Sequence, residues 1–451
     1  MLYRKIAETI EKHLLSQSDK IMVIQGARQV GKSFIIREVG SKLFKNFIEV
    51  NFVRDNEGPR LFKDIRTVED FYFQLSTSLG DKMGSREDTL IFLDEIQEYP
   101  QYLTMLKFFR EDKKYTFIAS GSLLGIALRN TVSIPVGSIT VKNMYPLDFQ
   151  EFLIANGFAV SAIDTIKERY NNQESLDEKT HNQIMDLFRK YLLVGGLPDA
   201  VNEFVQNRNL TRIREIQWDI RNMYVEDASK YEKASSKKLL IRKIYGMLPS
   251  FMENKKKRLV LKDIEGKKGA RASSYSDEFE YLTTSGIALG INAISNPVFP
   301  LGESEKKNLT KLYMNDVGLL TGVLFHNNIS AVMEDEKSIN LGGVYETVVA
   351  QELTAHCDSV YYYDNRQKGE VDFIINDYQT LSTLPIEVKS GRDYSVHSAL
   401  NKFVNNKDYG IKRGIVLSNK REVTQKEGIL YLPIYYSMFI YSDKNEEDIL
   451  I

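Results

Sequence analysis

The sequence has little cysteine, little proline and no excess of charge of either sign. Cys357 is the single cysteine among 451 residues, which excludes an intramolecular disulfide and fits a reducing compartment. Sixty basic residues against 61 acidic ones leave a net charge of -1, so any nucleic-acid-binding surface must be local. The sequence shows neither a signal-peptide pattern at its start nor a run of about 18 apolar residues that could span a membrane. We therefore expect a soluble, cytoplasmic protein without a membrane partner.

The remaining composition is that of a folded protein. Hydrophobic residues make up 43% of the chain, charged residues 27% and aromatic residues 11%, as in ordinary globular proteins. A chain of 451 residues is too long for one core, so about two to four domains are expected.

A glycine-rich loop lies near the start of the chain. It follows an apolar segment, 20–25, that predicts a buried strand, and it precedes a segment with a helical pattern. Glycines would let backbone amides surround the phosphates of ATP, Lys32 would reach the β- and γ-phosphates, and the Ser33 hydroxyl would bind Mg²⁺. The predicted ATP-binding residues are Gly26, Ala27, Arg28, Gln29, Val30, Gly31, Lys32 and Ser33. The alternative is a chance match, against which the strand, loop and helix order argues.

Polar residues end two further apolar segments. Residues 89–95 predict a strand that ends in Asp94 and Glu95. Asp94 would hold Mg²⁺ through water, and Glu95 would activate the attacking water as a catalytic base. Residues 115–122 predict another strand, which brings Ser120 or Ser122 to the place of a γ-phosphate sensor; we assign Ser120. Acids and serines at strand ends also occur as helix caps and turn residues.

Three buried strands that alternate with helical segments predict an α/β fold with a doubly wound parallel sheet. The motifs at 26–33, 93–97, 120–125, 144–153 and 191–198 together resemble a family of prokaryotic AAA+ ATPases related to the archaeal ATPases. The resemblance implies a P-loop AAA+ core over 1–144 and a helical lid over 145–232, with Gly195-Gly196 in a tight turn near the nucleotide. It also implies a homo-oligomer, with a monomer or dimer as the alternative. Arg129 is a candidate arginine finger or an ordinary surface arginine.

The middle of the chain combines helical patterns with a basic run. Segments 237–248 and 275–281 predict helices, and segments 286–292 and 297–301 predict short strands. Helices followed by a hairpin predict a winged-helix-like domain over 233–305. The densest positive cluster would bind nucleic-acid phosphates or form a solvated surface. It consists of Lys255–Arg258 with Lys262, Lys267, Lys268 and Arg271.

Two carboxylates are predicted to meet on a hairpin near the end of the chain. Segments 369–375 and 384–389 predict strands that bring Asp372 beside Glu387, and a predicted amphipathic helix over 341–353 carries Glu346. Asp372 and Glu387, together with the backbone carbonyl of Val388, offer oxygen ligands to Mg²⁺ or Mn²⁺, and Glu346 would complete the site. Lys389 lies two positions after Glu387 and so on the same side of its strand, where it would orient a hydrolytic water and neutralise charge on the phosphate.

Asp372, Glu387 and Lys389 resemble the PD-(D/E)xK nuclease motif. Many members of the resembled family end in a domain of unknown function with a restriction-endonuclease-like fold, which this implies for 306–451. We therefore predict an ATPase coupled to a metal-dependent, nuclease-like domain that acts on DNA or RNA. One alternative is an ATP-dependent signalling or defence switch whose last domain only binds nucleic acid or a protein. Another is a transcription-type regulator that acts through the winged helix.

Overall fold

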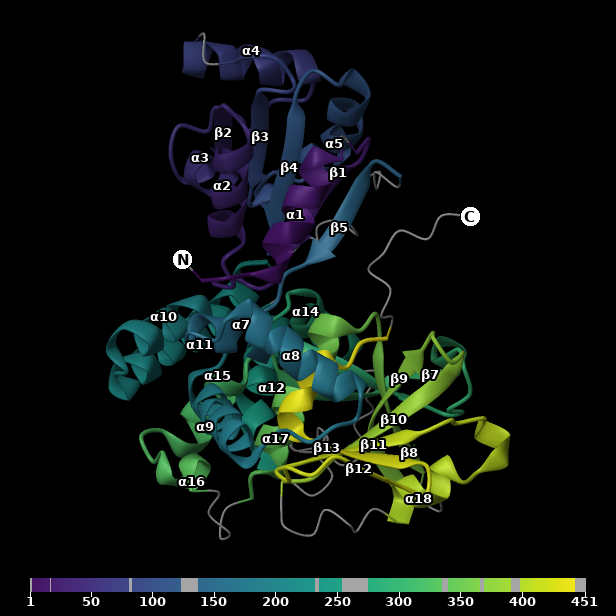
Figure 1. The fold of residues 1–451 in the computed structure, drawn as a ribbon. Coiled ribbons are helices and arrows are strands. Elements are labelled where there is room, and N and C mark those ends of the chain that lie inside the picture. Colours follow the sequence, from purple (N-terminus) through teal and green to yellow (C-terminus); the bar gives the residue numbers. More distant parts are fainter. Residues whose placement is uncertain are drawn as a thin grey trace. The chain divides into compact units, whose positions relative to one another are not determined.

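The computed structural model describes residues 2–16, 18–80, 83–122, 137–231, 235–253, 275–334, 340–365, 369–390 and 398–442 (Figure 1). The chain divides into two compact units. The N-terminal unit comprises Met1–Tyr145 with Thr284–Ile287, and the C-terminal unit comprises Pro146–Thr283 with Ala288–Ile451. Arg129 and the basic run Lys255–Arg258 lie outside the described residues.

The N-terminal unit contains a five-stranded parallel sheet in the order β2-β3-β4-β1-β5 (Figure 1). Its strands are β1 (Ile21–Gln25), β2 (Asn46–Asn51), β3 (Thr89–Asp94), β4 (Thr116–Gly121) and β5 (Ile139–Asn143). The three strands predicted from the sequence are confirmed as β1, β3 and β4, whereas β2 and β5 were not predicted. All six residues of β3 are buried, as expected of a central strand covered on both faces.

Helices connect these strands. They are α1 (Lys5–Leu15), α2 (Lys32–Leu43), α3 (Phe52–Glu57), α4 (Val68–Leu79) and α5 (Gln101–Asp112), with a 3₁₀ turn, η2 (Ile96–Glu98), directly after β3. Side chains cap two of them: Asn51 accepts from the Arg54 amide at the start of α3, and Thr67 accepts from the Asp70 amide at the start of α4. Such caps satisfy backbone donors that the first turn of a helix leaves unpaired.

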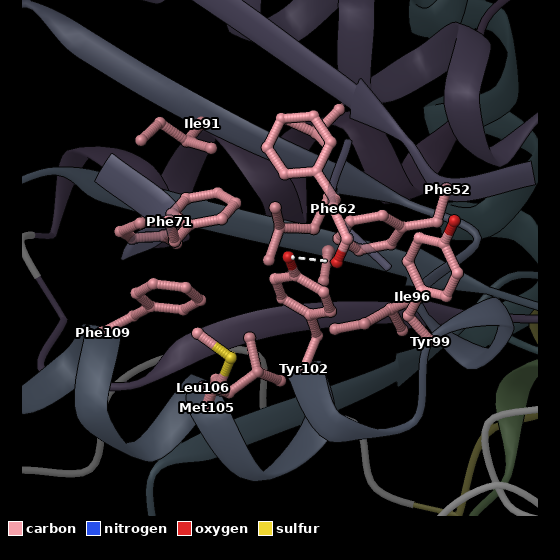
Figure 2. Packing of buried hydrophobic residues seen from close by; sticks show 14 of the residues in the cluster. Phe52, Phe62, Phe71, Ile91, Ile96, Tyr99, Tyr102, Met105, Leu106 and Phe109 are labelled. Atoms are coloured by element: carbon pink, nitrogen blue, oxygen red, sulfur yellow. Dashed lines mark hydrogen bonds between the residues drawn. The ribbon is translucent and has the colours of Figure 1, made fainter. Parts of the chain in front are cut away.

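An aromatic core holds α5 and η2 against this sheet (Figure 2). The ring centroids of Phe52 and Tyr102 lie 4.4 Å apart, and those of Phe109 and Phe117 lie 4.5 Å apart. The Tyr102 hydroxyl is fully buried and donates to the Phe62 carbonyl oxygen at 2.9 Å. Because β3 leads directly into η2 and α5, this packing fixes the segment that carries Asp94 and Glu95.

The C-terminal unit begins with helices and continues into a mixed sheet. Its helices are α7 (Phe149–Ala155), α8 (Val160–Asn171), α9 (Glu178–Val194), α10 (Pro198–Asn207), α11 (Leu210–Tyr231), α12 (Ser235–Glu253), α14 (Ser276–Thr284), α15 (Val317–Phe325), α16 (Ser330–Met333), α17 (Gly342–His356) and α18 (Ser398–Val404). Its strands are β6 (Ala288–Ile294), β7 (Glu305–Met314), β8 (Val360–Asn365), β9 (Gly369–Asp377), β10 (Ser382–Val388), β11 (Gly414–Ser418), β12 (Thr424–Lys426) and β13 (Ile429–Pro433).

The helices expected to form a lid pack on later parts of the same unit. The Phe149 amide donates to Glu352 Oε1 at 2.8 Å, which joins α7 to α17. The Gly196 amide donates to Asp316 Oδ2 at 2.6 Å, and a Cβ atom at Gly195 would lie 2.1 Å from Asp316 Oδ1. The turn at Gly195-Gly196 is therefore fitted around the Asp316 carboxylate, which caps α15.

The eight strands form one sheet in the order β12-β13-β11-β10-β9-β8-β6-β7. β6 pairs antiparallel with β7 on one edge and parallel with β8 on the other. The boundary expected at residue 305 therefore falls inside this sheet, because β6 and β7 lie on either side of it. The strand predicted at 297–301 is wrong: Pro297 and Pro300 supply no amide donor, and this connection leads into a 3₁₀ turn, η4 (Leu301–Ser304).

Candidate functional site

The glycine-rich loop leads from β1 into α2 as predicted. Gly31, at the N-cap of α2, has φ 95°, and Gln29 has φ 63°. Both lie in the left-handed region, which turns the loop back on itself. The Lys32 side chain is buried, and Nζ donates to the carbonyl oxygens of Gly26 at 3.0 Å and Ala27 at 2.8 Å. Burial lowers the pKa of Lys32, an effect opposed by the charges of Glu95 and Asp94.

Two contacts that the sequence did not reveal hold this loop in place. A Cβ atom at Gly26 would lie 2.2 Å from the Met144 carbonyl oxygen, so only glycine permits this approach. Arg4, which is buried, donates to the carbonyl oxygen of Val30 at 2.9 Å and to that of Tyr145 at 2.6 Å. Arg4 precedes α1 by one residue, and no motif marks it.

Asp94 is the centre of the predicted nucleotide site. Its Oδ1 accepts from the Ser33 hydroxyl at 2.8 Å and from the Ser120 hydroxyl at 2.5 Å. Its Oδ2 accepts from Asn51 Nδ2 at 2.7 Å. Burial raises the pKa of Asp94, and the bonds from Ser120 and Ser33 oppose that rise. The structure thus brings together three predicted residues, and it adds Asn51, which β2 holds in register with Asp94.

Glu95 lies immediately beyond β3 in a left-handed conformation, with φ 56°. Gln97 Nε2 donates to Glu95 Oε2 at 2.5 Å, and the Ser122 hydroxyl donates to the same oxygen at 3.3 Å. A non-glycine residue in this region of φ is uncommon and is a recognised feature of functional sites. Ser122, the other candidate sensor, therefore contacts Glu95, whereas Ser120 contacts Asp94.

The donor set around Asp94 suits Mg²⁺. Hydroxyl and carboxylate oxygens are the ligands that this ion prefers, and the Ser33 and Asp94 oxygens are already 2.8 Å apart. The site lies at the carboxyl ends of β1, β3 and β4, the usual ligand position in parallel α/β sheets.

The predicted hairpin near the end of the chain is confirmed as β9 and β10. The backbone amide of Val388 donates to Asp372 Oδ2 at 2.9 Å. Glu387 is buried, and its Oε1 accepts from Lys389 Nζ at 2.7 Å. Among the described residues its Oε2 has no hydrogen-bond partner. Burial and then the charge of Asp372 raise the pKa of Glu387 to about 8.

Glu346 reaches the same region from α17. It is buried, and the Tyr313 hydroxyl donates to its Oε2 at 3.5 Å. Its charge acts on Glu387 and on Lys389. Within the part of the chain that the structure describes, however, no three Asp, Glu, His or Cys side chains form a group that could hold a metal ion. The carboxylates are engaged otherwise: Asp372 accepts a backbone amide, and Glu387 is paired with Lys389.

A buried ion pair beside these carboxylates was not predicted. Lys311 on β7 has a side chain that is 1% exposed, and its Nζ lies 2.6 Å from Glu370 Oε1 on β9. The same Nζ lies 4.7 Å from the centre of the Tyr362 ring. The only signal in the sequence was a lysine inside the largely apolar segment 309–314. We name the acidic cluster from its carboxylates and their two lysines: Glu346, Glu370, Asp372 and Glu387, with Lys311 and Lys389.

Comparison with known families agrees with the geometry of the N-terminal unit. Residues 18–153 match the family model of an AAA domain. The chain therefore carries an ATPase-like AAA domain, and the P-loop and Asp94 lie within it. Residues 185–329 and 341–436 match two domains of unknown function, DUF8612 and DUF4143. The acidic cluster draws Lys311 from the first of these segments and its four carboxylates from the second.

Individual relatives are remote. Uncharacterized protein MJ1544 of Methanocaldococcus jannaschii is 24% identical over 184 residues, which are 40% of this chain and 36% of the relative. This chain thus matches about a third of that relative's length.

Two similar solved structures share still less sequence with this chain. The Walker-type ATPase PABY2304 of Pyrococcus abyssi has a TM-score of 0.43 at 13% identity, over 72% of this chain and 96% of that one. The ORC1 protein of Aeropyrum pernix, solved in complex with DNA, has a TM-score of 0.30 at 14% identity, over 73% and 92%. Likenesses this remote assign neither fold nor activity to this chain.

None of the helices in the described part of the chain has the length and apolar character needed to span a membrane.

Proposed function

We propose that this protein binds and hydrolyses ATP in the presence of Mg²⁺. The observation that carries this proposal is the hydrogen-bonded group of Ser33, Asp94 and Ser120 beside the phosphate loop of an AAA domain. Ser33, Asp94 and Ser120 come from α2, β3 and β4, and both hydroxyls donate to the Asp94 carboxylate. A structural role alone would not require that convergence at the carboxyl ends of parallel strands.

Each residue has a distinct role in this proposal. The amides of the loop and Lys32 bind the phosphates, and Ser33 and Asp94 hold the metal. Mg²⁺ held there would supply positive charge to offset the negative charge that develops on the phosphates. Glu95 orients the attacking water and accepts its proton. Gln97 Nε2 donates to Glu95 Oε2 at 2.5 Å and orients that carboxylate. Ser120 acts as the sensor of the γ-phosphate.

Substitution of Lys32 tests the nucleotide site. Lys32→Ala is expected to abolish both ATP binding, measured by calorimetry, and phosphate release. Lys42→Ala is the matched control, because Lys42 lies on the same helix and its side chain is 69% exposed. ATP binding by the Lys32→Ala variant at wild-type affinity would contradict the proposal.

We further propose that residues 306–451 form a metal-dependent, nuclease-like domain coupled to the ATPase. The supporting observation is a buried carboxylate oxygen, Glu387 Oε2, that lacks a partner among the described residues and lies beside Asp372. Oxygen donors of this kind suit Mg²⁺ or Mn²⁺. The Val388 amide donates to Asp372 Oδ2, and the Lys389 ammonium donates to Glu387 Oε1. An ion that binds these two oxygens must displace both donors.

The nuclease proposal has its own test. Labelled DNA and RNA are incubated with Mg²⁺ or Mn²⁺, with and without ATP. Asp372→Ala and Lys389→Ala are expected to lose cleavage and to retain ATP hydrolysis. Absence of cleavage under every condition would contradict the proposal and favour a switch whose last domain only binds nucleic acid or a protein.

A further inference from the structure

Lys311 is a charged residue in a place that favours an apolar one. Its neighbours on β7, Leu312, Tyr313 and Met314, are all buried, and the Lys311 side chain is 1% exposed. Taking an ammonium ion out of water costs several kcal/mol unless opposite charges compensate. Burial lowers the pKa of Lys311, but the charges of Glu346, Glu370 and Asp372 outweigh it and raise that pKa. The lysine is therefore held as a cation by the carboxylates around it.

The acidic cluster contains more carboxylates than lysines. Its four carboxyl groups face two ammonium groups, Lys311 and Lys389, and each lysine is affected by both Glu346 and Asp372. Lys389 Nζ lies 2.7 Å from Glu387 Oε1, and Lys311 Nζ lies 2.6 Å from Glu370 Oε1. Together with the Glu387 oxygen that has no partner among the described residues, this leaves the cluster negative but already partly neutralised by the protein.

We infer that Lys311 is the resident cation of the acidic cluster and that its charge weakens the binding of a divalent cation there. Like charges repel strongly where water is excluded, so a divalent ion near Asp372 and Glu346 must bind against the Lys311 ammonium. The protein itself then supplies part of the positive charge that a metal ion would otherwise bring to these carboxylates. This inference uses the nuclease proposal only in treating the cluster as a site for a divalent cation.

Manganese binding to the full chain tests this role. Free Mn²⁺ is measured by electron paramagnetic resonance without nucleotide, and binding that Asp372→Ala removes is assigned to the cluster. Lys311→Met is expected to bind Mn²⁺ at least tenfold more tightly than the wild type. Lys311→Arg, which retains the charge, should stay within about threefold of the wild type. Lys306→Met is the matched control, because Lys306 is an exposed lysine on the same strand.

A double variant separates charge from packing. Lys311→Met/Glu370→Gln removes one positive and one negative charge together, so its affinity for Mn²⁺ should return toward that of the wild type. Unchanged or weaker Mn²⁺ binding by a folded Lys311→Met protein would overturn the inference. If Lys311→Met does not fold, Lys311→Gln takes its place. Variants that fold only when Mn²⁺ is present would support the inference, and variants that fold neither with nor without Mn²⁺ would overturn it.

Failure of this inference can be told apart from failure of the nuclease proposal. If the wild type cleaves nucleic acid but Lys311→Met binds Mn²⁺ no more tightly, only the role of Lys311 is wrong. If no nucleic acid is cleaved but Lys311→Met gains Mn²⁺ binding that Asp372→Ala removes, the role of Lys311 stands and the nuclease activity does not.

Discussion

Asp94 in the N-terminal unit and Glu387 in the C-terminal unit are both buried carboxylates with a raised pKa, but their partners differ in kind. Asp94 accepts hydrogen bonds on both oxygens from neutral groups, the hydroxyls of Ser33 and Ser120 and the amide of Asn51. Glu387 has a single cationic partner, Lys389, and one oxygen without a partner among the described residues. Neutral donors orient a carboxylate without compensating its negative charge, whereas a lysine ammonium compensates that charge. In our proposal the first arrangement is available to Mg²⁺, whereas in the second a metal ion would compete with Lys389.

The largest effect is expected at Glu95. Glu95→Gln keeps the shape of the side chain but removes the base, so ATP turnover should fall by roughly 10²- to 10⁴-fold, while ATP affinity stays within about threefold of the wild type. Single-turnover hydrolysis and calorimetry measure the two quantities. Ser122→Ala is the matched control, because Ser122 contacts the same Glu95 oxygen at 3.3 Å without a role in proton transfer. Equal losses in the two variants would show that the orientation of Glu95, rather than its basicity, determines turnover.

The stability of the protein should depend on pH through Glu387 of the acidic cluster. The pKa of Glu387 rises from 4.5 to about 8 on folding, so its contribution to stability is fully present below about pH 4.5 and is lost as the pH rises through 8. Glu387→Gln should therefore leave stability unchanged near pH 5 and increase it by about 1–3 kcal/mol near pH 9.

Denaturant unfolding at both pH values measures that difference. Glu422→Gln is the control, because the Glu422 side chain is 57% exposed in the same unit. A variant that is less stable than the wild type at pH 9 would show that Lys389 compensates the buried charge of Glu387, and would remove the contrast between the two sites.

Local motifs and periodicity predicted much of the structure. The loop at 26–33, the acids that end β3, and the hairpin of β9 and β10 all form where the sequence indicated, because each depends on neighbours close in the chain. The helix with Glu346 was expected to be amphipathic, but in α17 every residue from Gly343 to Leu353 is buried. Its surroundings come from several distant segments, and one helical period does not reveal them.

Two contacts that depend on the order of strands in a sheet were not predicted. Asn51 and Asp94 are 43 positions apart and meet only because β2 pairs with β3. Lys311 on β7 reaches Glu370 on β9 because β6 pairs with both β7 and β8 in one sheet. The domain boundary that we expected at residue 305 had separated β6 from β7. Strand order decides both contacts, and no short motif encodes strand order.

Removal of Asn51 should have a moderate effect that is specific to the nucleotide site. Asn51→Ala removes the amide donor on Asp94 Oδ2 and the cap of α3. We expect about a tenfold loss in kcat/KM for ATP and a loss of about 1 kcal/mol in stability. Thr67→Ala removes a helix cap and a hydroxyl bond to Asp70 in the same unit, and it should reduce stability by a similar amount without affecting kcat/KM. If both variants lose activity equally, the bond to Asp94 contributes nothing beyond folding.

The smallest effect on the nucleotide site should come from the aromatic core that packs on β3, and it tests whether the geometry of Asp94 depends on that core. Tyr102→Phe removes the hydroxyl that donates to the Phe62 carbonyl oxygen and leaves that oxygen buried. The N-terminal unit should lose about 1–2 kcal/mol of stability, as measured by thermal unfolding, with ATP affinity unchanged. Asp94 is held by Ser33, Ser120 and Asn51 through bonds that Tyr102 does not touch. A parallel loss of ATP affinity would instead mean that the packing of α5, and not the neutral donors, holds Asp94 ready for Mg²⁺.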